Sequence, residues 1–567
     1  MAAKAPVLNE SLRQRLMRRM SHLKTDRSSW ETHWRELADY MAPRRGRWSL
    51  ADHNRGQKMH DRIMDGTPLF AARTLASGMM AGLTSPARPW FRLTTPDPAL
   101  SERAAVKAWL YAVENRMRDV FQKSNLYNVL PVIYGELGVF GTACMLALED
   151  EETAVRFVPL PIGSYWLATN YRLEVDTVYR EFRYTVRQTV QEFGLEACSD
   201  RVRGLAQGGN WEAPVDIYHA IEPNNEQVFG RADASGMPFR SVYWEKGGEK
   251  DQVLAVRGFR ESPVLAPRWN VVGEDVYGYS PGMDALGDSK ALMLQQMRKA
   301  EAIDKMVDPP MGAPTSLRNS VVSMLPGDVT YFDTQQGASG VRPLYEVKPD
   351  INALVADIAE TQQRINTAFY ADLFLMLSMS DRRQITAREI EERHEEKLLM
   401  LGPVLERLDD ELLGPMIDRT FGIMLRAGLI PEPPPELEGI DLKVEYISIL
   451  AQAQKMVGIG AVDRLSGFVG QLATIWPEAR HKFDAQQAVD EYADMLGVSP
   501  RLVRPDDAVA ELEQADAQAQ AAAQMGGMAK MMRDGAGAVK DLSQAPVGPD
   551  GEQTALSALA GALGGPA

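Results

Sequence analysis

A long amphipathic segment between two proline boundaries is the feature that most restricts the fold of this chain. Pro281 opens the segment SPGMDALGDSKALMLQQMRKAEAIDKMVDPP and Pro309-Pro310 closes it, because proline fits the first turn of a helix but interrupts its interior. The spacing predicts a helix of about 24 residues, on the order of 36 Å long. Its apolar face consists of Leu286, Met293, Met297, Ala300, Ile303 and Val307. Such a length is unusual for a globular domain.

A second helix of nearly the same length follows a short insertion. It runs from Pro349 to about Tyr370, and its apolar stripe consists of Ile351, Leu354, Val355, Ile358, Ile365 and Phe369. The insertion, residues 311–347, carries short β-type runs around a Pro326-Gly327 turn. Two long helices that bracket a compact insertion predict a hairpin-like stalk with a small domain at its tip.

The two helices of this stalk cannot cover both apolar stripes on all sides within one subunit. We therefore expect neighbouring subunits to complete the packing, as in a closed ring with heterologous contacts. The residues expected at these contacts between subunits are Leu286, Met293, Met297, Ile358 and Ile365.

A third helix is predicted to start at Thr386, which forms a capping box with Glu389. Its periodicity continues toward Leu425, and Pro403 predicts a kink. Between Thr386 and Thr420 the chain has 10 acidic and 5 basic residues, so this helix is a poor phosphate binder. Two adjacent arginines, Arg382 and Arg383, lie on the short polar loop just before it.

The remainder of the chain is an α+β mixture that is mainly helical. Residues 1–280 combine helical patterns with β-rich runs at 155–168, 176–186 and 214–222. After PEPPPE (431–436), the run DLKVEYISIL is the best strand candidate before further helices. Beyond Arg504 an Ala- and Gln-rich stretch predicts a helix, followed from about residue 532 by a mobile tail rich in Gly, Ala and Pro.

Composition excludes several classes of protein. The chain has 567 residues, 45% of them hydrophobic, and a net charge of −15, which argues against a surface that grips nucleic acid everywhere. The two cysteines, Cys144 and Cys198, are too few for a disulfide scaffold and predict buried thiols in a reducing compartment. We find neither a secretory signal nor an apolar run long enough to predict a membrane span.

The first fifty residues are nevertheless basic, with 11 Lys or Arg against 5 Asp or Glu. Leu12, Leu16 and Leu23 recur at helical spacing, which favours an ordinary helix with a solvated basic face. A basic arm that binds a partner is the alternative.

No motif for catalysis, for a cofactor or for a metal stands out. The chain lacks a phosphate-binding Gly-Lys-Ser/Thr loop, paired histidines and a Gly-x-Ser-x-Gly elbow, and His394 has no second histidine four residues on. Asp409, Asp410 and Glu411 could in principle hold Mg²⁺, but consecutive helical residues point in different directions. We therefore expect no enzyme activity, no cofactor and no metal site.

Several stretches together resemble one family, the portal or head-to-tail connector proteins of short-tailed bacteriophages (podovirus type). They are WETHWRELADYMAPRRG, DGTPLFAARTLASGMMAGLTSPARPWFRL (65–93), SNLYNVLPVIYGELGVFGTACM (124–145) and the run from RWNVVGEDVYGYSP to KMVDPPM. The resemblance extends to about residue 500. The aromatic residues of RPWF are expected to be core anchors rather than a platform for nucleobases.

The resemblance implies a ring, in this family typically of twelve subunits, around a channel for double-stranded DNA that is not read by sequence. Its parts would be a wing (1–280), two stem helices (281–307 and 349–370), a clip (308–348), a tunnel loop (371–385), a long kinked helix (386–427), a segment connecting wing and crown (428–504) and a crown helix with its tail (505–567). The tunnel-loop residues expected to face the channel are Ser378, Ser380, Arg382, Arg383 and Gln384.

The resemblance also implies partners and a location. The ring would sit at one vertex of the capsid in the virion after assembly in the host cytoplasm, away from any membrane. It would contact the major capsid and scaffolding proteins, the terminase large subunit, tail adaptor or nozzle proteins, and internal core proteins. Two alternatives stay open, namely a structural scaffold protein of the virion without a channel and a metal-dependent enzyme that processes nucleic acid.

Overall fold

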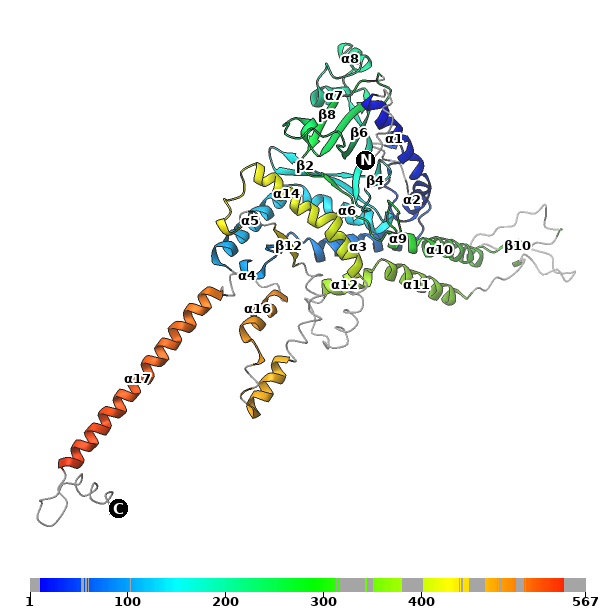
Figure 1. The fold of residues 1–567 in the computed structure, drawn as a ribbon. Coiled ribbons are helices and arrows are strands. Elements are labelled where there is room, and N and C mark those ends of the chain that lie inside the picture. The colour runs from blue at the N-terminus through cyan, green and yellow to red at the C-terminus, as the bar shows by residue number, and fades with distance from the viewer. Residues whose placement is uncertain are drawn as a thin grey trace, which may run out of the picture. The chain divides into compact units, whose positions relative to one another are not determined.

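The computed structural model describes residues 11–312, 350–379, 401–447, 465–495 and 504–544, apart from some positions within these ranges, together with residues 315, 318, 342 and 343 (Figure 1). The chain divides into two compact units. The larger contains residues 1–93, 112–432 and 444–483, and the smaller contains 94–111, 433–443 and 484–567. Most of the insertion 311–347 and the start of the third predicted helix lie outside the described residues.

A five-stranded antiparallel sheet forms one part of the larger unit (Figure 1). In spatial order its strands are β4 (Tyr165–Thr169), β5 (Val175–Thr185), β6 (Pro214–Pro223), β7 (Phe239–Glu245) and β8 (Ala255–Phe259). The register pairs Val178 with Ile221 and Ile221 with Ser241. The β-rich runs predicted at 176–186 and 214–222 are thereby confirmed as strands β5 and β6.

Helices cover both faces of this sheet. On one face, Leu16 and Met20 of α1 (Leu12–Asp26) pack against a cluster that includes Trp166 and Trp244. On the other face, α7 (Val186–Phe193) and α8 (Asp200–Gln207) bury a second cluster around Cys198. Side chains of successive residues in the central strands β6 and β7 alternate between the two clusters, so these strands place apolar residues on both faces.

Two basic residues, Arg13 of α1 and Arg27 at the junction of α1 with α2 (Ser28–Met41), are buried against other segments of the chain. The guanidinium of Arg13 donates to the backbone oxygens of Glu245 and Gln252, and that of Arg27 donates to the oxygens of Gly163 and Tyr165. Both side chains are buried. The expectation of a solvated basic face is therefore wrong for these two arginines, because backbone oxygens of distant segments accept their N–H groups.

A second, three-stranded sheet of order β3-β2-β9 packs with buried helices. The elements are β2 (Cys144–Asp150), β3 (Ala154–Leu160), β9 (Val264–Leu265), α3 (Thr67–Leu83), α5 (Ala104–Lys123) and α6 (Leu126–Phe140). The first predicted β run, 155–168, is confirmed, since it spans β3 and the start of β4. Cys144 and Cys198 are buried free thiols, as expected.

The aromatic residues of RPWF are core anchors, as predicted. Trp90 and Phe91 are buried, and both rings lie within 6 Å of the Phe121 ring, centroid to centroid. Next to them, β1 (Phe91–Thr94) pairs with β12 (Lys443–Tyr446), which confirms a strand in DLKVEYISIL.

The two long predicted helices are present. The first is divided into α9 (Pro281–Asp284) and α10 (Leu286–Val307), and the second is α11 (Ile351–Ala368), whose first turn is capped by the Asp350 carboxylate. Near the far ends of α10 and α11, β10 (Met311–Gly312) pairs with β11 (Arg342–Pro343).

The first part of the predicted tunnel loop is helical. Residues Ala371–Met379 form α12, which follows α11 after Tyr370, a non-glycine residue with φ of 54°. The sequence ADLFLMLSM consists largely of good helix formers, and Ala371, Leu373 and Phe374 are buried. The prediction of a loop over 371–379 is therefore wrong, because the apolar side chains pack in the body.

The region of the predicted kinked helix is described from residue 401 onward, and a departure from regular geometry follows Pro403. Residues 401–408 are α-helical through the proline. A π-helical turn follows at Asp409–Leu413, and α14 (Gly414–Arg426) continues from it with Pro415 in its first turn. A π-helical turn accommodates one extra residue and leaves a local irregularity, which the sequence did not predict at 409–413. The turn before Pro403 lies outside the described residues, so the kink at Pro403 stays a prediction.

The smaller unit contains α4 (Pro98–Ser101), α16 (Ala485–Met495) and α17 (Asp506–Gln544). The Ala- and Gln-rich stretch is thus helical, as predicted, but the helix extends to Gln544 and not only to about residue 532. Alanine-rich segments have high helix propensity, which overrides the scattered glycines here. Within the described parts of the chain, none of the helices is both long enough and apolar enough to cross a bilayer.

The contact between α3 and α12 depends on a glycine. A Cβ atom at Gly78 would collide with the Cβ and Cγ atoms of Phe374, which cannot move without moving α12. We expect Gly78→Ala to destabilise the larger unit by about 1–3 kcal/mol, as overpacking of a core does. Gly204→Ala in α8 is the control, because open space surrounds that position and alanine should stabilise the helix by about 0.5–1 kcal/mol. Calorimetry in which both variants melt like the wild type would contradict this account of the α3–α12 contact.

Candidate functional site

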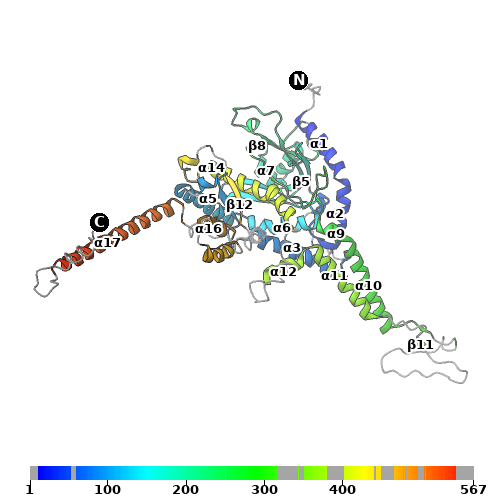
Figure 2. The same ribbon diagram turned by 60° about the horizontal axis from the view of Figure 1, so that its bottom comes forward.

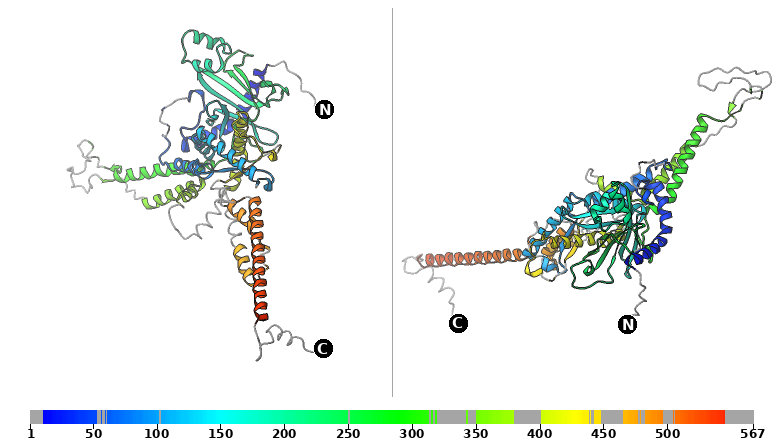
Figure 3. Two further views of the ribbon diagram at one scale, coloured as in Figure 1. Left: turned by 90° about the vertical axis from the view of Figure 1, so that its left-hand side faces the viewer. Right: turned by 90° about the horizontal axis from the view of Figure 1, so that it is seen from above.

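Helices α10 and α11, here called the stem, lie side by side and project from the body (Figure 2). The same arrangement is visible in the further views (Figure 3). Polar pairs fix their antiparallel register. The Gln295 amide donates to the Asp357 carboxylate over 2.7 Å, and Arg364 forms an ion pair with Asp288 at 3.2 Å.

The base of the stem is held by one carboxylate. Asp65, two residues before α3, accepts hydrogen bonds from the Gln296 amide of α10 at 2.7 Å and from the Gln362 amide of α11 at 2.8 Å. Its other oxygen accepts from the backbone N–H and the hydroxyl of Thr67. Partial burial alone would raise the pKa of Asp65, but these hydrogen bonds outweigh it, so the pKa lies below the ordinary value of 3.8. The carboxylate is therefore charged at neutral pH and links both stem helices to the body.

Two further contacts attach α10 alone. The Met293 sulfur lies 3.2 Å from the backbone N of Met64 and accepts its N–H, and Lys290 forms an ion pair with Glu36 of α2. These attachments concern the part of α10 that is nearest the body.

Apolar residues become exposed along the stem with distance from the body. Of the five residues predicted to pack between subunits, Leu286, Met293, Ile358 and Ile365 are buried within the single chain. Met297 is 38% exposed. Leu294 and Val355 are also exposed, as are Ile303, Met306 and, at 79%, Val307 toward the far end of α10. The base of the stem is thus packed by its own chain, and the accessible apolar surface lies beyond it.

The predicted channel residues are mostly outside the described part of the chain. Ser378 belongs to helix α12. Ser380, Arg382, Arg383 and Gln384 lie outside the described residues, as do Thr386 and Glu389 of the predicted capping box.

The acidic run at 409–411 is used for packing contacts. Glu411 accepts hydrogen bonds from the backbone N–H and the guanidinium of Arg268, the shortest at 2.6 Å. Burial raises the pKa of Asp409 to about 7. Among the described residues there is no group of three or more His, Cys, Asp or Glu side chains placed to hold a metal ion.

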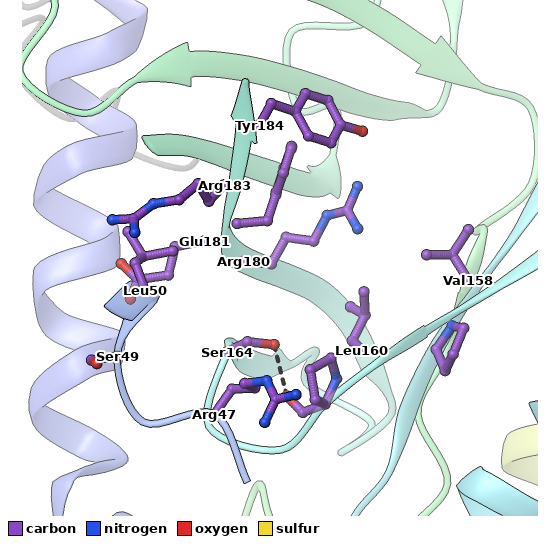
Figure 4. A pocket seen from close by; sticks show the side chains of 13 residues that line it. Arg47, Ser49, Leu50, Val158, Leu160, Ser164, Arg180, Glu181, Arg183 and Tyr184 are labelled. Carbon is purple, nitrogen blue, oxygen red and sulfur yellow. Dashed lines mark hydrogen bonds between the residues drawn. The ribbon is translucent and has the colours of Figure 1, made fainter. Parts of the chain in front are cut away.

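A pocket of about 300 Å³ lies between the end of β3, strand β5 and loop 43–50, the segment that follows α2 (Figure 4). Arg180 and Arg183 both line it. Arg180 donates through Nε to Nδ1 of His219, and Arg183 donates through Nε to the carboxylate of Asp216. Arg47 and the Glu181 carboxylate are further lining groups, so the pocket contains charges of both signs.

Loop 43–50 also borders a second pocket, between α2, α3 and α6, here called the α2–α3 pocket. Its volume is about 340 Å³, and Arg44 and Arg45 of the loop and Arg73 of α3 line it. Sequence reasoning quoted the APRRG run only as part of a family resemblance and did not identify it as a site. The signal was present, since three arginines occur within four residues at 44–47.

Comparison with known proteins identifies the family. The profile of a family described as "Bacteriophage head to tail connecting protein" matches residues 13–503. The portal protein of Salmonella phage epsilon15 is 48% identical over 558 residues, covering 98% of this chain and 99% of that protein. A probable portal protein of Bordetella phage BPP-1 is 47% identical over 512 residues, covering 90% and 92%.

Among solved structures, chains from the neck of a gene transfer agent particle are similar at a low level. Two of these structures are titled with C6 and with C12 symmetry, share 12% identity, and cover 77% of this chain and 91% of their own. Their TM-scores of 0.35 and 0.36 are too low to indicate a shared fold.

The family match covers most of the chain, so the chain belongs to the bacteriophage head-to-tail connecting proteins. Within this family, its near full-length similarity to portal proteins gives it the phage portal function.

The attachment of the stem can be tested at Asp65. We expect Asp65→Ala to leave the Gln296 and Gln362 amides without their acceptor and to loosen both helices, at a cost of about 1–3 kcal/mol. Hydrogen exchange of the backbone amides at the base of α10 and α11 should then be faster. Asp65→Asn is the matched control, because the two glutamine amides can rotate and accept from the Asn amide. Unchanged exchange in Asp65→Ala would show that Asp65 does not hold the stem.

Proposed function

We propose that the chain assembles into a closed ring whose channel conducts double-stranded DNA at one vertex of the capsid. The observation that carries this proposal is the exposed apolar surface of the stem beyond its buried base. A monomer would leave Met297, Ile303 and Val307 in contact with water on a projecting helix pair, whereas neighbouring stems in a ring would cover them.

In this proposal the parts of the chain have distinct roles. The two sheets with their helices form the wing, α10 and α11 form the stem, and residues 308–348 form a clip at the far end of the stem. Because the clip lies at the tip of a stalk, it would dock the terminase during packaging and the tail adaptor or nozzle proteins later. Helix α17 with residues 545–567 would form the crown.

The family membership supports a structural connector of the virion, and the ATP-driven motor would be a separate protein. The chain has a net charge of −15, which is consistent with a channel that repels the DNA phosphates overall and so does not bind the moving DNA tightly. Capsid, scaffolding and internal core proteins would contact the outer parts of the ring.

The ring can be tested through Met297, which is the accessible residue of the five predicted at subunit contacts. We expect Met297→Asp to raise the protein concentration that is needed for assembly at least tenfold, because a carboxylate would be buried at every interface of the ring. The volume-conserving Met297→Leu should assemble normally. Light scattering and end-on electron microscopy would measure this, and wild-type rings formed by Met297→Asp would exclude this side of the stem from the interface.

The channel can be tested at Arg382 and Arg383, which we propose to form a collar of positive charge inside the ring. Repeated in every subunit, the pair would touch phosphates without reading bases. Replacing both arginines by alanine should leave rings intact but reduce retention of packaged DNA, with a defect that grows as salt screens the remaining contacts. The double lysine variant, which keeps the charge, should retain more DNA. Equal retention by the alanine variant and the wild type at every salt concentration would contradict the collar.

A further inference from the structure

The α2–α3 pocket concentrates positive charge without any compensating acid. None of the 13 residues that line it is an aspartate or a glutamate. Arg44 and Arg73 form no ion pair among the described residues, in contrast to Arg183 of the pocket in Figure 4, which is paired with Asp216. An unpaired guanidinium at a concave surface favours an anionic ligand.

Arg45 is held in place by its surroundings. One of its terminal nitrogens donates to the backbone oxygen of Val132 over 2.8 Å. A Cβ atom at Gly135 would lie 2.8 Å from its other terminal nitrogen, so the glycine provides the space in which the guanidinium lies against α6. A guanidinium fixed in this way loses little conformational entropy when it binds a ligand.

Glu136 of α6 interacts electrostatically with Arg45 but does not neutralise its charge. Glu136 is fully buried, one of its oxygens has no hydrogen-bond partner, and burial raises its pKa to about 8 despite the opposing effect of Arg45. The carboxyl group is thus mostly protonated at neutral pH. Arg45 keeps its charge available to a ligand.

Helix α3 contributes the opposite wall. Arg73 and Ser77 are four residues apart, so they lie on one side of the helix, and the Arg73 guanidinium rests over the Phe70 ring at 5.9 Å from its centroid. The rest of the lining is largely apolar, including Ala72, Ala76 and Val139. Apolar walls reduce solvent screening and strengthen charge-assisted hydrogen bonds.

We propose that the α2–α3 pocket is a phosphate-binding site, in which Arg44, Arg45 and Arg73 hold the phosphate oxygens and the Ser77 hydroxyl donates a further hydrogen bond. Guanidinium groups match phosphate oxygens in geometry as well as in charge. The phosphate can come from the backbone of double-stranded DNA or from a free phosphate compound. The site goes beyond the proposed function, because it lies in the body of a single chain and requires neither the stem contacts nor a closed ring.

The test compares two double variants that remove the same charge. Arg44→Ala with Arg73→Ala removes from the pocket two cations that form no ion pair among the described residues. The control, Arg187→Ala with Arg257→Ala, removes two exposed arginines, one in α7 and one in β8, that are paired with Glu212 and Glu192. Binding of inorganic phosphate would be measured by calorimetry, and binding of a 20-base-pair DNA duplex by fluorescence anisotropy at several salt concentrations.

We expect the pocket variant to bind inorganic phosphate at least tenfold more weakly than the control variant. If DNA is the source of the phosphate, the pocket variant should also bind the duplex more weakly. The slope of log affinity against log salt concentration should then fall by about one, because one counterion fewer is released on binding. If only phosphate binding falls, the site takes a free phosphate compound. Equal phosphate and duplex binding by the two variants would overturn the proposal. Light scattering on each variant reports ring formation separately, so a failure of assembly is not mistaken for the loss of this site.

Discussion

The arrangement of the stem depends on the Asp65 carboxylate, where residues of three distant segments meet. Gln296 and Gln362 are 66 residues apart in sequence, and the bonds they donate to one carboxylate bring the bases of α10 and α11 together on the body. The pairs Gln295–Asp357 and Arg364–Asp288 then extend the same register along the helices. Since a pair of long helices has little core of its own, this polar anchoring decides where the stem leaves the body.

The two ends of the stem differ in how far their apolar residues are buried. Near the body, Met293, Ile358 and Ile365 are packed by their own chain, which makes that end part of the folded unit. Beyond Met297, the apolar side chains of Ile303, Met306 and Val307 are exposed among the described residues. An assembly that forms through such a surface can be built from subunits that fold first, because the stability of the body and the contacts between subunits rest on different residues.

Arginines in the body show how context decides the role of a charge. Arg13 and Arg27 are buried and bind backbone oxygens, whereas Arg44 and Arg73 face a pocket that contains no acid. All four lie in segments whose local sequence predicts only a helix or a loop and gives no sign of these different roles. The difference comes from what the neighbouring strands and helices present to each side chain, and a local pattern cannot show this.

Much of the architecture could be predicted from the sequence. Proline boundaries and the spacing of apolar residues determined both stem helices, alternation of apolar residues determined strands β5 and β6, and the high propensity of the Ala-rich stretch determined α17. These features are local, since they depend on residues within a few turns of one another. The family, too, could be named from short stretches read in order.

Only the tertiary structure decided the rest. Helix α12 replaced part of a predicted loop because Phe374 packs over Gly78, and an irregular turn that the sequence did not predict lies at 409–413, where Glu411 binds Arg268. Four of the five residues predicted between subunits proved to be buried by their own chain, and the α2–α3 pocket was assembled from an arginine-rich loop and one face of α3. Periodicity shows that a face is apolar or charged, but the segment that covers the face comes from far along the chain, so its identity follows only from the folded structure.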